Sequence, residues 1–175
     1  MSSAPDRAGP SALIRRATTA DVPAIRALAH AIWHAHYPGI ITVAQIDYML
    51  ARSYSPEVLS AEIAGDRVEY YLLDADGAAA GYASIGPTDQ PGEFKLHKIY
   101  LRPAWHGRGL GSRLLAHVES VARGHGAHTL ILTVNKKNEK ALAAYRRNGF
   151  AVRCAAVFDI GGGFVMDDFV LAKKL

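Results

Sequence analysis

The segment from His97 to Leu115, HKIYLRPAWHGRGLGSRLL, joins an apolar strand pattern to an amphipathic helix through a proline and three glycines. Gly107, Gly109 and Gly111 stand at alternate positions directly before the helix. Glycine permits left-handed backbone angles and a close approach to the main chain. The N-terminus of a helix adds free N–H groups and about half an elementary positive charge. The segment therefore predicts either a loop that binds a pyrophosphate or a tight strand-to-helix turn, and its spacing alone does not decide between them.

The spacing of apolar residues changes along the chain, from helical periods to short alternating runs. Helical spacing with capping and breaking residues predicts helices over 18–33, 42–54, 55–65, 112–123 and 138–149. Short apolar runs, two of them around the Asp76-Gly77 turn, predict strands over 12–17, 68–75, 78–86, 93–101 and 128–135, and two more within 151–175. This order predicts a mixed α/β fold of the α+β type, with helices packed over a largely antiparallel sheet.

Length and composition indicate the domain organisation and the compartment. The 175 residues are most simply one domain over 10–175, behind a loose tail at 1–9 that is small, polar and proline-bearing. Cys154 is the one cysteine, so no intramolecular disulfide can form. The first residues lack the apolar core of a secretory signal, and no apolar run approaches the roughly 20 residues that span a bilayer. We therefore expect a cytoplasmic protein that does not enter a membrane.

The net charge of +4 favours an anionic partner, but the basic residues are scattered. The sequence lacks a recognisable DNA-reading helix or a platform of stacked aromatic residues, so we expect no nucleic-acid partner. His34 and His36 point in different directions on a helix, and His125 and His128 flank a glycine turn without further ligands nearby. The sequence therefore predicts no metal site.

Two linked motifs resemble the GNAT family of acyl-CoA-dependent acetyltransferases. The segment WHGRGLG, reached through IYLRPAW, is similar to motif A of that family, whose loop reads Q/R-x-x-G-x-G/A. Gly109 and Gly111 match, whereas His106 stands where the family carries Gln or Arg. About two dozen residues on, LTVNKKNEKALAAYRRNGF resembles the strand and helix that follow in the family. The residues of this second motif that match are Asn135, Asn138, Ala141, Tyr145, Gly149 and Phe150.

The resemblance covers most of the chain. The segments IWHAHYPGIITVAQIDYML and DIGGGFVMDDFVLAKKL are similar to a bacterial GNAT subgroup whose members mostly have no assigned substrate. A looser similarity links the chain to polyamine-acetylating members. The resemblance implies a central sheet whose two middle strands, at HKIYL and LTVN, splay apart to admit pantetheine, with helices on both faces. It also implies that the glycine loop holds the pyrophosphate of acetyl-CoA. The cofactor contacts expected on this basis are Ile99, Tyr100, Leu101, His106, Gly107, Arg108, Gly109, Leu110, Gly111, Ser112, Asn135, Asn138, Ala141 and Tyr145.

The chemistry that the resemblance implies is direct attack of a neutral amine on the thioester. Tyr145 is expected to be the acid, because its hydroxyl would lie near the cofactor sulfur and a phenol pKa near 10 suits a thiolate. His97 and Glu93 are equally ranked as the base, since relatives carry a histidine or a glutamate near these positions. Both share one strand face with Ile99 and Leu101 if no bulge intervenes. The backbone of Ile99 and Leu101 is expected to contact the oxyanion and the pantetheine.

The acceptor pocket is expected to form between the segment WHAHYPG and the end of the chain. Aromatic side chains would wall it, and carboxylates would bind a cation. The candidates are Trp33, Tyr37, Asp159 and Asp167, with His34, His36 and Asp168 beside them. The alternative interpretation is that Trp33 belongs to the core and that the aspartates form turns.

These observations predict an N-acetyltransferase that moves the acetyl group of acetyl-CoA to a primary amine of a small molecule in a ternary complex. One alternative is an enzyme that acetylates a protein N-terminus or a lysine. Another is a module that binds acyl-CoA without turnover. Members of the family are often dimers, so a homodimer is possible, although no segment of the sequence specifies an interface.

Overall fold

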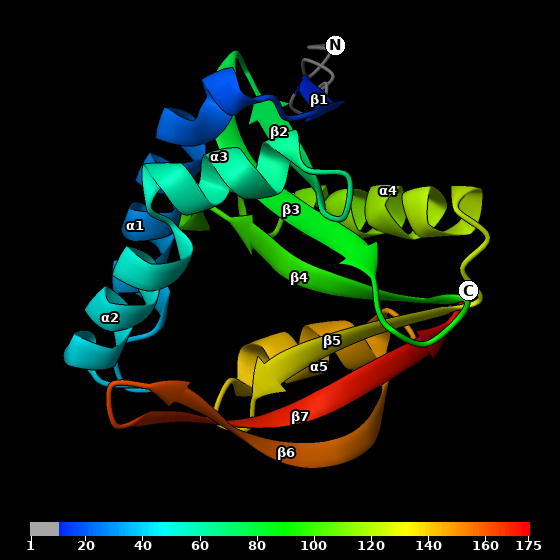
Figure 1. The fold of residues 1–175 in the computed structure, drawn as a ribbon. Coiled ribbons are helices and arrows are strands. Elements are labelled where there is room, and N and C mark those ends of the chain that lie inside the picture. The colour runs from blue at the N-terminus through cyan, green and yellow to red at the C-terminus, as the bar shows by residue number, and fades with distance from the viewer. Residues whose placement is uncertain (1–10) are drawn as a thin grey trace, which may run out of the picture.

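The computed structural model describes residues 11–175, so the tail expected at 1–9 lies outside the described residues. Seven strands form one sheet in the order β1-β2-β3-β4-β5-β7-β6 (Figure 1). The strands are β1 (Ala12–Arg16), β2 (Glu69–Ala75), β3 (Ala78–Pro87), β4 (Glu93–Leu101), β5 (Thr129–Asn135), β6 (Ala151–Gly161) and β7 (Phe164–Lys174). The helices are α1 (Val22–His36), α2 (Val43–Ser53), α3 (Pro56–Ala64), α4 (Leu110–Gly124) and α5 (Glu139–Arg147), with short 3-10 turns η1 (Thr19–Asp21) and η2 (Pro103–Trp105). Of the neighbouring strands, β4 and β5 run parallel and every other pair is antiparallel.

Helices cover both faces of the sheet, as the sequence predicts (Figure 1). On one face, α1, α2 and α3 form a buried cluster with alternate residues of β2 and β3. On the other face, α4 and Leu142 of α5 pack against the opposite residues of β2 and β3 and against β4, β5 and β7. Because successive strand residues point to opposite faces, the two clusters share the same strands without sharing side chains. The sheet is therefore the wall between two separate cores.

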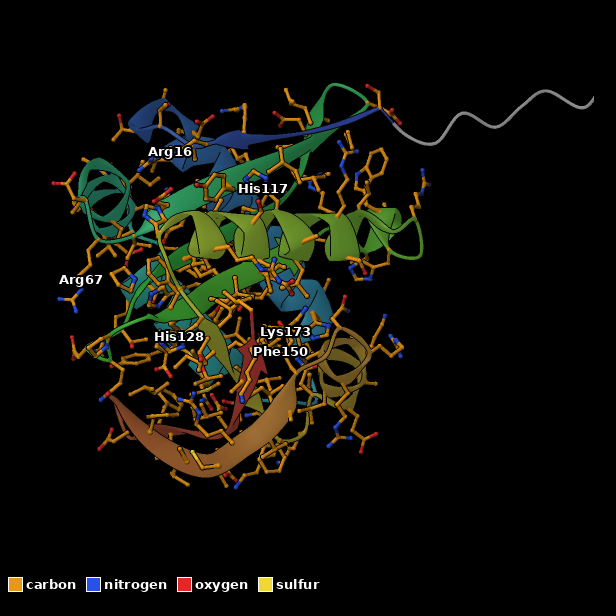
Figure 2. The ribbon with its side chains drawn as sticks, turned by 90° about the vertical axis from the view of Figure 1, so that its right-hand side faces the viewer. Arg16, Arg67, His117, His128, Phe150 and Lys173 are labelled. Atoms are coloured by element: carbon orange, nitrogen blue, oxygen red, sulfur yellow. The ribbon has the colours of Figure 1, made fainter. Side chains whose placement is uncertain are left out.

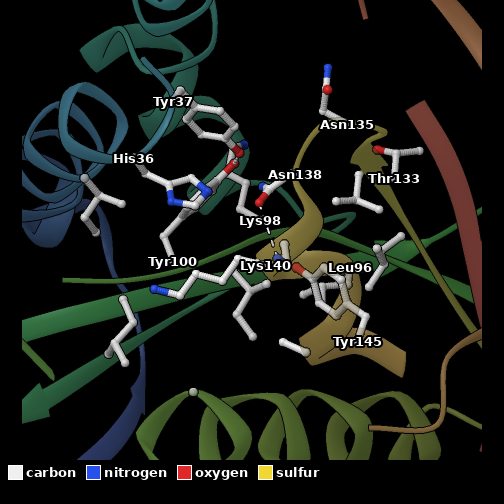
Figure 3. Close-up of a pocket in the computed structure, with 18 of the residues that line it drawn as sticks. His36, Tyr37, Leu96, Lys98, Tyr100, Thr133, Asn135, Asn138, Lys140 and Tyr145 are labelled. Atoms are coloured by element: carbon white, nitrogen blue, oxygen red, sulfur yellow. Dashed lines mark hydrogen bonds between the residues drawn. The ribbon is translucent and has the colours of Figure 1, made fainter. Parts of the chain in front are cut away.

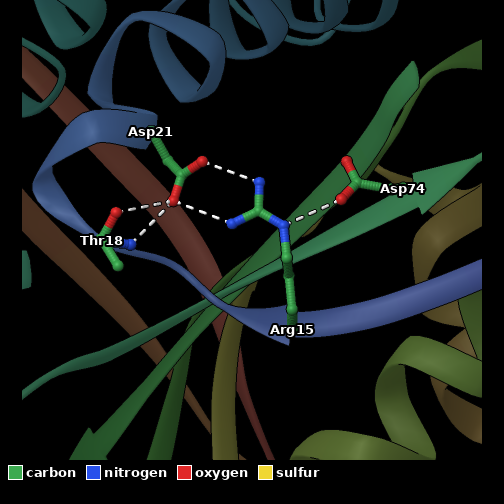
Figure 4. A network of polar contacts seen from close by, with 4 residues as sticks. All are labelled: Arg15, Thr18, Asp21 and Asp74. Atoms are coloured by element: carbon green, nitrogen blue, oxygen red, sulfur yellow. Dashed lines mark hydrogen bonds and ion pairs between the residues drawn. The ribbon is translucent and has the colours of Figure 1, made fainter. Parts of the chain in front are cut away.

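Polar side chains fix the point at which α1 leaves the sheet (Figure 4). Thr18 and Asp21 form a reciprocal capping box over η1, in which the Thr18 N–H donates to Asp21 Oδ2 at 2.8 Å. Arg15 of β1 bridges Asp21 and Asp74 of β2 at 2.8 and 3.0 Å. The Arg15 guanidinium lowers the pKa of Asp21 to about 2. The turn that precedes α1 is thus tied to β1 and β2, at one side of the sheet.

The two middle strands part after a short stretch of pairing. β4 pairs with β5 at Glu93, Phe94 and Lys95, and no residue of β4 beyond Lys95 pairs with β5 in the described structure. β5 continues to Asn135 in full register with β7, while β4 continues to Leu101 paired with β3. The sheet is therefore split into two halves that are joined at one end and open at the other.

A bulge in β4 corrects one expectation. Ser84 of β3 lies opposite Lys98 while Ile85 lies opposite Leu96, so His97 is an extra residue in the strand. An extra residue inverts the alternation, and Glu93 therefore does not share a face with Ile99 and Leu101. Ile99 and Leu101 instead pack in the same cluster as Phe94 and Leu96, under α4.

A polar clamp secures the joined end of the split. Lys173 of β7 donates to Glu119 of α4 at 2.6 Å, and its ammonium lies 5.8 Å from the centre of the Phe150 ring (Figure 2). Glu93, at the start of β4, accepts from Arg153 of β6 at 2.7 Å. Both contacts hold elements of the β5–β7–β6 half against the other half at the end where β4 and β5 are still paired.

The close approach of β3 to β4 gives a test of this arrangement. A Cβ added at Gly81 would lie 2.5 Å from the Tyr100 carbonyl oxygen, which is backbone and cannot move alone. We expect Gly81→Ala to reduce the free energy of unfolding by about 2 kcal/mol and the melting temperature by about 4–8 °C. Chemical and thermal denaturation measure both quantities.

Gly124→Ala is the matched control, because a Cβ there meets no atom within 4 Å and the residue ends helix α4. It should leave the stability unchanged or raise it by a few tenths of a kcal/mol. Equal stability of the two variants would contradict the tight packing of β3 on β4 beside the split.

Candidate functional site

A cleft of about 890 Å³ opens where β4 and β5 part (Figure 3). It is lined by the end of α1, by β4 beyond Lys95, by the loop into α4, by β5, by α5 and by the β6–β7 hairpin. The split in the sheet forms the floor of this cleft, and segments far apart in the sequence form its walls. The sequence-predicted site residues can therefore be placed relative to one concave surface.

The glycine loop lines one end of the cleft. Gly107 and Gly109 have φ angles of 74° and 76°, and Gly109 is the N-cap of α4. The helix begins at Leu110, two residues before the predicted start at Ser112. A Cβ added at Gly107, Gly109 or Gly111 would meet no atom within 4 Å. The space beside these glycines is thus open, which leaves room for an anion to approach the N-terminus of α4.

Side chains of the same loop fold back on their own chain. The His106 ring is 2.9 Å from the Leu101 carbonyl oxygen, and the Arg108 guanidinium lies 4.9 Å from the centre of the Trp105 ring. His106, Gly107, Gly109, Gly111 and Ser112 line the cleft, whereas Arg108 and Leu110 do not. The loop therefore presents backbone and one histidine to the cleft.

The edge of β4 supplies main-chain groups to the split. Arg102 N–H donates to the Ala80 carbonyl at 2.8 Å, which makes Tyr100 the next residue of β4 that bonds to β3. Hydrogen-bonded and unbonded positions alternate in an antiparallel ladder, so Ile99 and Leu101 direct their N–H and C=O groups away from β3. β5 has already departed at that level. These two residues therefore present main-chain donors to the gap.

Helix α5 and the end of β5 form the opposite wall. Asn138 caps α5, since its side-chain oxygen accepts from the Ala141 N–H at 3.3 Å, and the Asn135 oxygen accepts from the Lys137 N–H at 2.9 Å. Both asparagines are buried and line the cleft, together with Ala141. Their side chains are thus held by hydrogen bonds to the backbone, which is also the structural role that a polar residue can have without binding a cofactor.

The Tyr145 hydroxyl points into the middle of the cleft, toward the region that the Tyr37 hydroxyl also faces (Figure 3). Its ring packs edge-on against Phe150 at 5.8 Å. Burial and the neighbouring Tyr37 raise the pKa of Tyr145 above its usual range. Tyr145 is therefore a neutral hydrogen-bond donor throughout the physiological range of pH.

An aromatic cluster walls the other end of the cleft. Trp33 lies 4.8 Å from Tyr37, 5.8 Å from Tyr54 and 5.7 Å from Tyr100, measured between ring centres. The Tyr37 and Tyr100 hydroxyls are 3.2 Å apart. Trp33 is 5% exposed, so it belongs to the core as well as to the wall. Sequence reasoning missed Tyr54 in this cluster, and the clue was its place directly after the apolar face of α2.

The three aspartates near the end of the chain occupy different positions relative to the cleft. Strand alternation along β7 places Met166 and Asp168 toward the cleft, whereas the Asp167 side chain is 56% exposed and pairs with Lys136. Asp159 accepts from the Gly161 N–H in the turn of the hairpin and does not line the cleft. The expectation that Asp159 and Asp167 wall the acceptor pocket is thus corrected, and Asp168 is the aspartate that the fold brings there.

The two candidate bases, Glu93 and His97, also differ in position, because only His97 lines the cleft. Glu93 is 8% exposed, accepts from Arg153 at 2.7 Å and from the Thr88 hydroxyl at 3.1 Å, and lies outside the cleft. His97 lines the cleft at the bulge; its side chain is exposed, and partial desolvation together with the charges of Lys95 and Lys98 lowers its pKa. The bulge is the physical reason why the two residues do not act on one surface.

Two features of the described residues bear on partners. Among residues 11–175, no group of three or more histidine, cysteine, aspartate or glutamate side chains is arranged to hold a metal ion. None of the helices in that range combines the length and the apolar character needed to cross a bilayer.

Comparisons with known proteins agree with this geometry. The chain is 26% identical over 165 residues to a spermidine N(1)-acetyltransferase of Thermoplasma acidophilum, covering 92% of this chain and 96% of the relative. It is 35% identical over 99 residues to an N-alpha-acetyltransferase RimI of Mycobacterium tuberculosis, covering 55% and 61% of the two chains. The crystal structure of a PaiA N-acetyltransferase from Thermoplasma acidophilum with coenzyme A superposes with a TM-score of 0.81 at 25% identity, covering 94% of this chain and 99% of the other.

The family model that matches the chain spans residues 28–150, which include the second half of α1, the split between β4 and β5, the glycine loop and α5. Its description is the acetyltransferase (GNAT) family. The fold and the two motifs that the sequence predicts are therefore confirmed, and the chain belongs to the GNAT family of N-acetyltransferases.

Proposed function

We propose that the protein transfers the acetyl group of acetyl-CoA to a primary amine of a small molecule. The observation that carries the proposal is the parting of β4 and β5 after three residue pairs, which opens a cleft between a glycine loop and an aromatic wall. The structure of the Thermoplasma relative contains coenzyme A, which supports acetyl-CoA as the cosubstrate here. The glycine loop suits its pyrophosphate, because free N–H groups and the helix dipole meet at Gly109 and Leu110.

The reaction would proceed by direct attack of a neutral amine on the thioester carbonyl. The N–H groups of Ile99 and Leu101 face the split and are the candidates to bind the oxyanion of the tetrahedral adduct. Tyr145 would protonate the departing thiolate, since its hydroxyl stays protonated and points into the cleft. Asn135, Asn138 and Ala141 would line the passage for pantetheine.

The lining of the acceptor end favours a small amine. Trp33, Tyr37 and Tyr100 enclose it on one side, and the β6–β7 hairpin encloses it on the other. The hairpin is docked on α2, where Gln45 and Tyr48 donate to the carbonyl oxygens of Val165 and Ile160 at 2.9 and 3.0 Å. The spermidine-acetylating relative matches over 92% of this chain, whereas the N-alpha-acetylating one matches over 55%. Acetylation of a protein N-terminus is the second candidate, on the strength of that shorter match.

The first test compares the protein with Tyr145→Phe. Acetyl-CoA-dependent thiol release is measured against a panel of polyamines, arylalkylamines, amino acids, aminoglycosides and short peptides. If Tyr145 is the acid, the variant should lose about 100-fold in kcat. Its affinity for coenzyme A, measured by calorimetry, should stay within twofold, because the ring and its packing on Phe150 remain.

The pattern across the panel separates the alternatives. Thiol release with one pool of small amines supports the proposal, and release only with short peptides supports the N-terminal candidate. Tight binding of acetyl-CoA with no release from any pool would contradict an acetyltransferase of small amines and favour a binding module.

The second test concerns the glycine loop. Gly109→Ala adds a Cβ at a φ of 76°, which costs about 1–2 kcal/mol, and places it where the pyrophosphate would lie. We expect the affinity for coenzyme A to fall about tenfold or more.

Gly77→Ala is the matched control for that variant, since Gly77 has a φ of 81°, equally open space and a place in the β2–β3 hairpin outside the cleft. It should lose similar stability and keep the full affinity. Equal loss of affinity in both variants would mean that the loop does not bind the cofactor.

A further inference from the structure

Asp168 is a buried carboxylate that the reaction outlined above does not use. It lies in the middle of β7, 5% exposed, opposite Asn135 of β5 and Ala156 of β6. Its side chain lines the cleft, on the strand face that also carries Met166. The residue therefore stands where the open end of the split meets the acceptor wall.

No described residue hydrogen-bonds to the buried Oδ1 of Asp168. The described chain buries two other carboxylates, and both are paired: Glu93 with Arg153, and Glu119 with Lys173. Buried charges in proteins are normally paired, because an uncompensated charge loses its hydration without replacement. An orphaned carboxylate that faces a cleft thus points to a cationic or proton-donating group that arrives from solution.

The charged and titratable groups around Asp168 come from several elements. Burial and Asp167 on the same strand raise the pKa of Asp168, while Lys95 of β4 and Lys136 after β5 lower it, and the pKa comes to about 6. From the end of α1, Tyr37 faces the same space, and the charge of Asp168 helps burial to raise the pKa of Tyr37. The carboxylate is therefore ionised at neutral pH and yet holds a proton more firmly than a free aspartate.

Tyr37 connects Asp168 to the reacting end of the cleft. The charge of Asp168 helps to raise the pKa of Tyr37. Tyr37 in turn helps to raise the pKa of Tyr145, whose hydroxyl lies across the cleft (Figure 3). Tyr37, Tyr145 and Asp168 all line this cleft, so an amine bound in it would meet both the carboxylate and the two hydroxyls. The aromatic rings of Trp33, Tyr37 and Tyr100 also suit an ammonium, since ring faces attract cations.

We propose that Asp168 is the base of the transfer: it binds the incoming ammonium group and removes its first proton. This inference rests on the proposed function. The carboxylate takes H⁺ from R–NH₃⁺, which leaves R–NH₂ to attack the carbonyl carbon. The C–N bond forms and the C–S bond breaks, and the thiolate takes the Tyr145 proton. Tyr145 regains a proton from the nitrogen of the adduct, and Asp168 releases its proton to solvent, so the products are R–NH–COCH₃, CoA–SH and H⁺.

The two bases expected from the sequence fit this step less well. Glu93 is committed to Arg153 and Thr88 at the joined end of the split, outside the cleft. His97 lines the cleft, but with a pKa of about 4 it is a much weaker base than a carboxylate whose pKa is about 6. A base works best when its pKa lies near the working pH. Asp168 satisfies that condition and also has an unoccupied acceptor atom.

Asp168→Asn tests the inference, because it keeps the shape and removes the charge. The probe is spermidine first, followed by the amine of the panel that the wild type acetylates fastest. We expect kcat/KM at pH 7.5 to fall about 100-fold, with kcat reduced and coenzyme A affinity within twofold of the wild type. The activity of the wild type should fall as the pH drops through about 6. The variant should lack this limb of the pH–activity profile, but it should keep the limb that reflects the ionisation of the acceptor amine.

Asp47→Asn is the charge-matched control, since Asp47 is 61% exposed on α2 and lies outside the cleft. It should keep the activity and the pH profile of the wild type. If Asp168→Asn also keeps them, the inference fails while the proposed function stands. A raised KM with unchanged kcat and an intact limb near pH 6 would also overturn it, since Asp168 would then bind the amine without taking its proton. If the wild type acetylates no amine of the panel, the proposed function fails, and the inference fails with it.

Thermal denaturation gives a readout that needs no acceptor. A carboxyl whose pKa is raised by folding destabilises the folded state above that pKa, and the cost is relieved as the pH falls through it. Asp168→Asn should therefore melt a few degrees higher than the wild type at pH 8, and the difference should shrink by pH 5. A difference that does not change with pH would show that the carboxylate is not held unpaired, which counts against the inference.

Discussion

The parting of β4 and β5 is the constraint on which the rest of the structure depends. Three parallel pairs are enough to keep the sheet continuous, and the ion pairs of Glu119 with Lys173 and of Glu93 with Arg153 secure it at that end. Beyond Lys95 the main-chain groups on the free edge of β4 have no strand partner from β5. Backbone groups that are left unpaired inside a protein must meet water or a ligand. A gap of this kind therefore favours an extended, amide-bearing molecule, and pantetheine is one.

The elements around the split divide the cleft into two ends of different character. At one end, the left-handed turn at Gly109 exposes the N–H groups of α4 and favours negative charge. At the other end, Trp33, Tyr37 and Tyr100 offer ring faces, and Asp168 offers a carboxylate, which together favour positive charge. Tyr145 lies between the two ends. A reaction that joins an anionic cosubstrate to a cationic acceptor needs this separation, because each partner then binds without competing for the other's end.

The sequence was informative where the signal is local and uninformative where it depends on register. The helix start at Ser55 and the turn at Asp76-Gly77 are formed by neighbours in the chain, and the structure has both as predicted. The bulge at His97 exists only in the pairing of β4 with β3, so no pattern within β4 announces it. For the same reason the sequence favoured Asp159 and Asp167, whereas the structure brings Asp168 to the cleft. Which of two adjacent residues faces the cleft depends on how β7 pairs with β5 and β6, and two bulges in β6 alter that register.

The three buried carboxylates show how the fold separates stability from chemistry. Glu93 and Glu119 lie at the joined end of the split, and each has a cation within 2.7 Å. Asp168 lies at the open end, where Lys136 is engaged with Asp167 and leaves its neighbour unpaired. A lysine turned toward Asp168 would stabilise the fold, but it would also neutralise the group that meets the acceptor. Strand alternation prevents this, because it places adjacent aspartates on opposite faces and gives the cation to the outer one. The unpaired charge in the cleft is thus a consequence of the same two-residue period that builds the sheet.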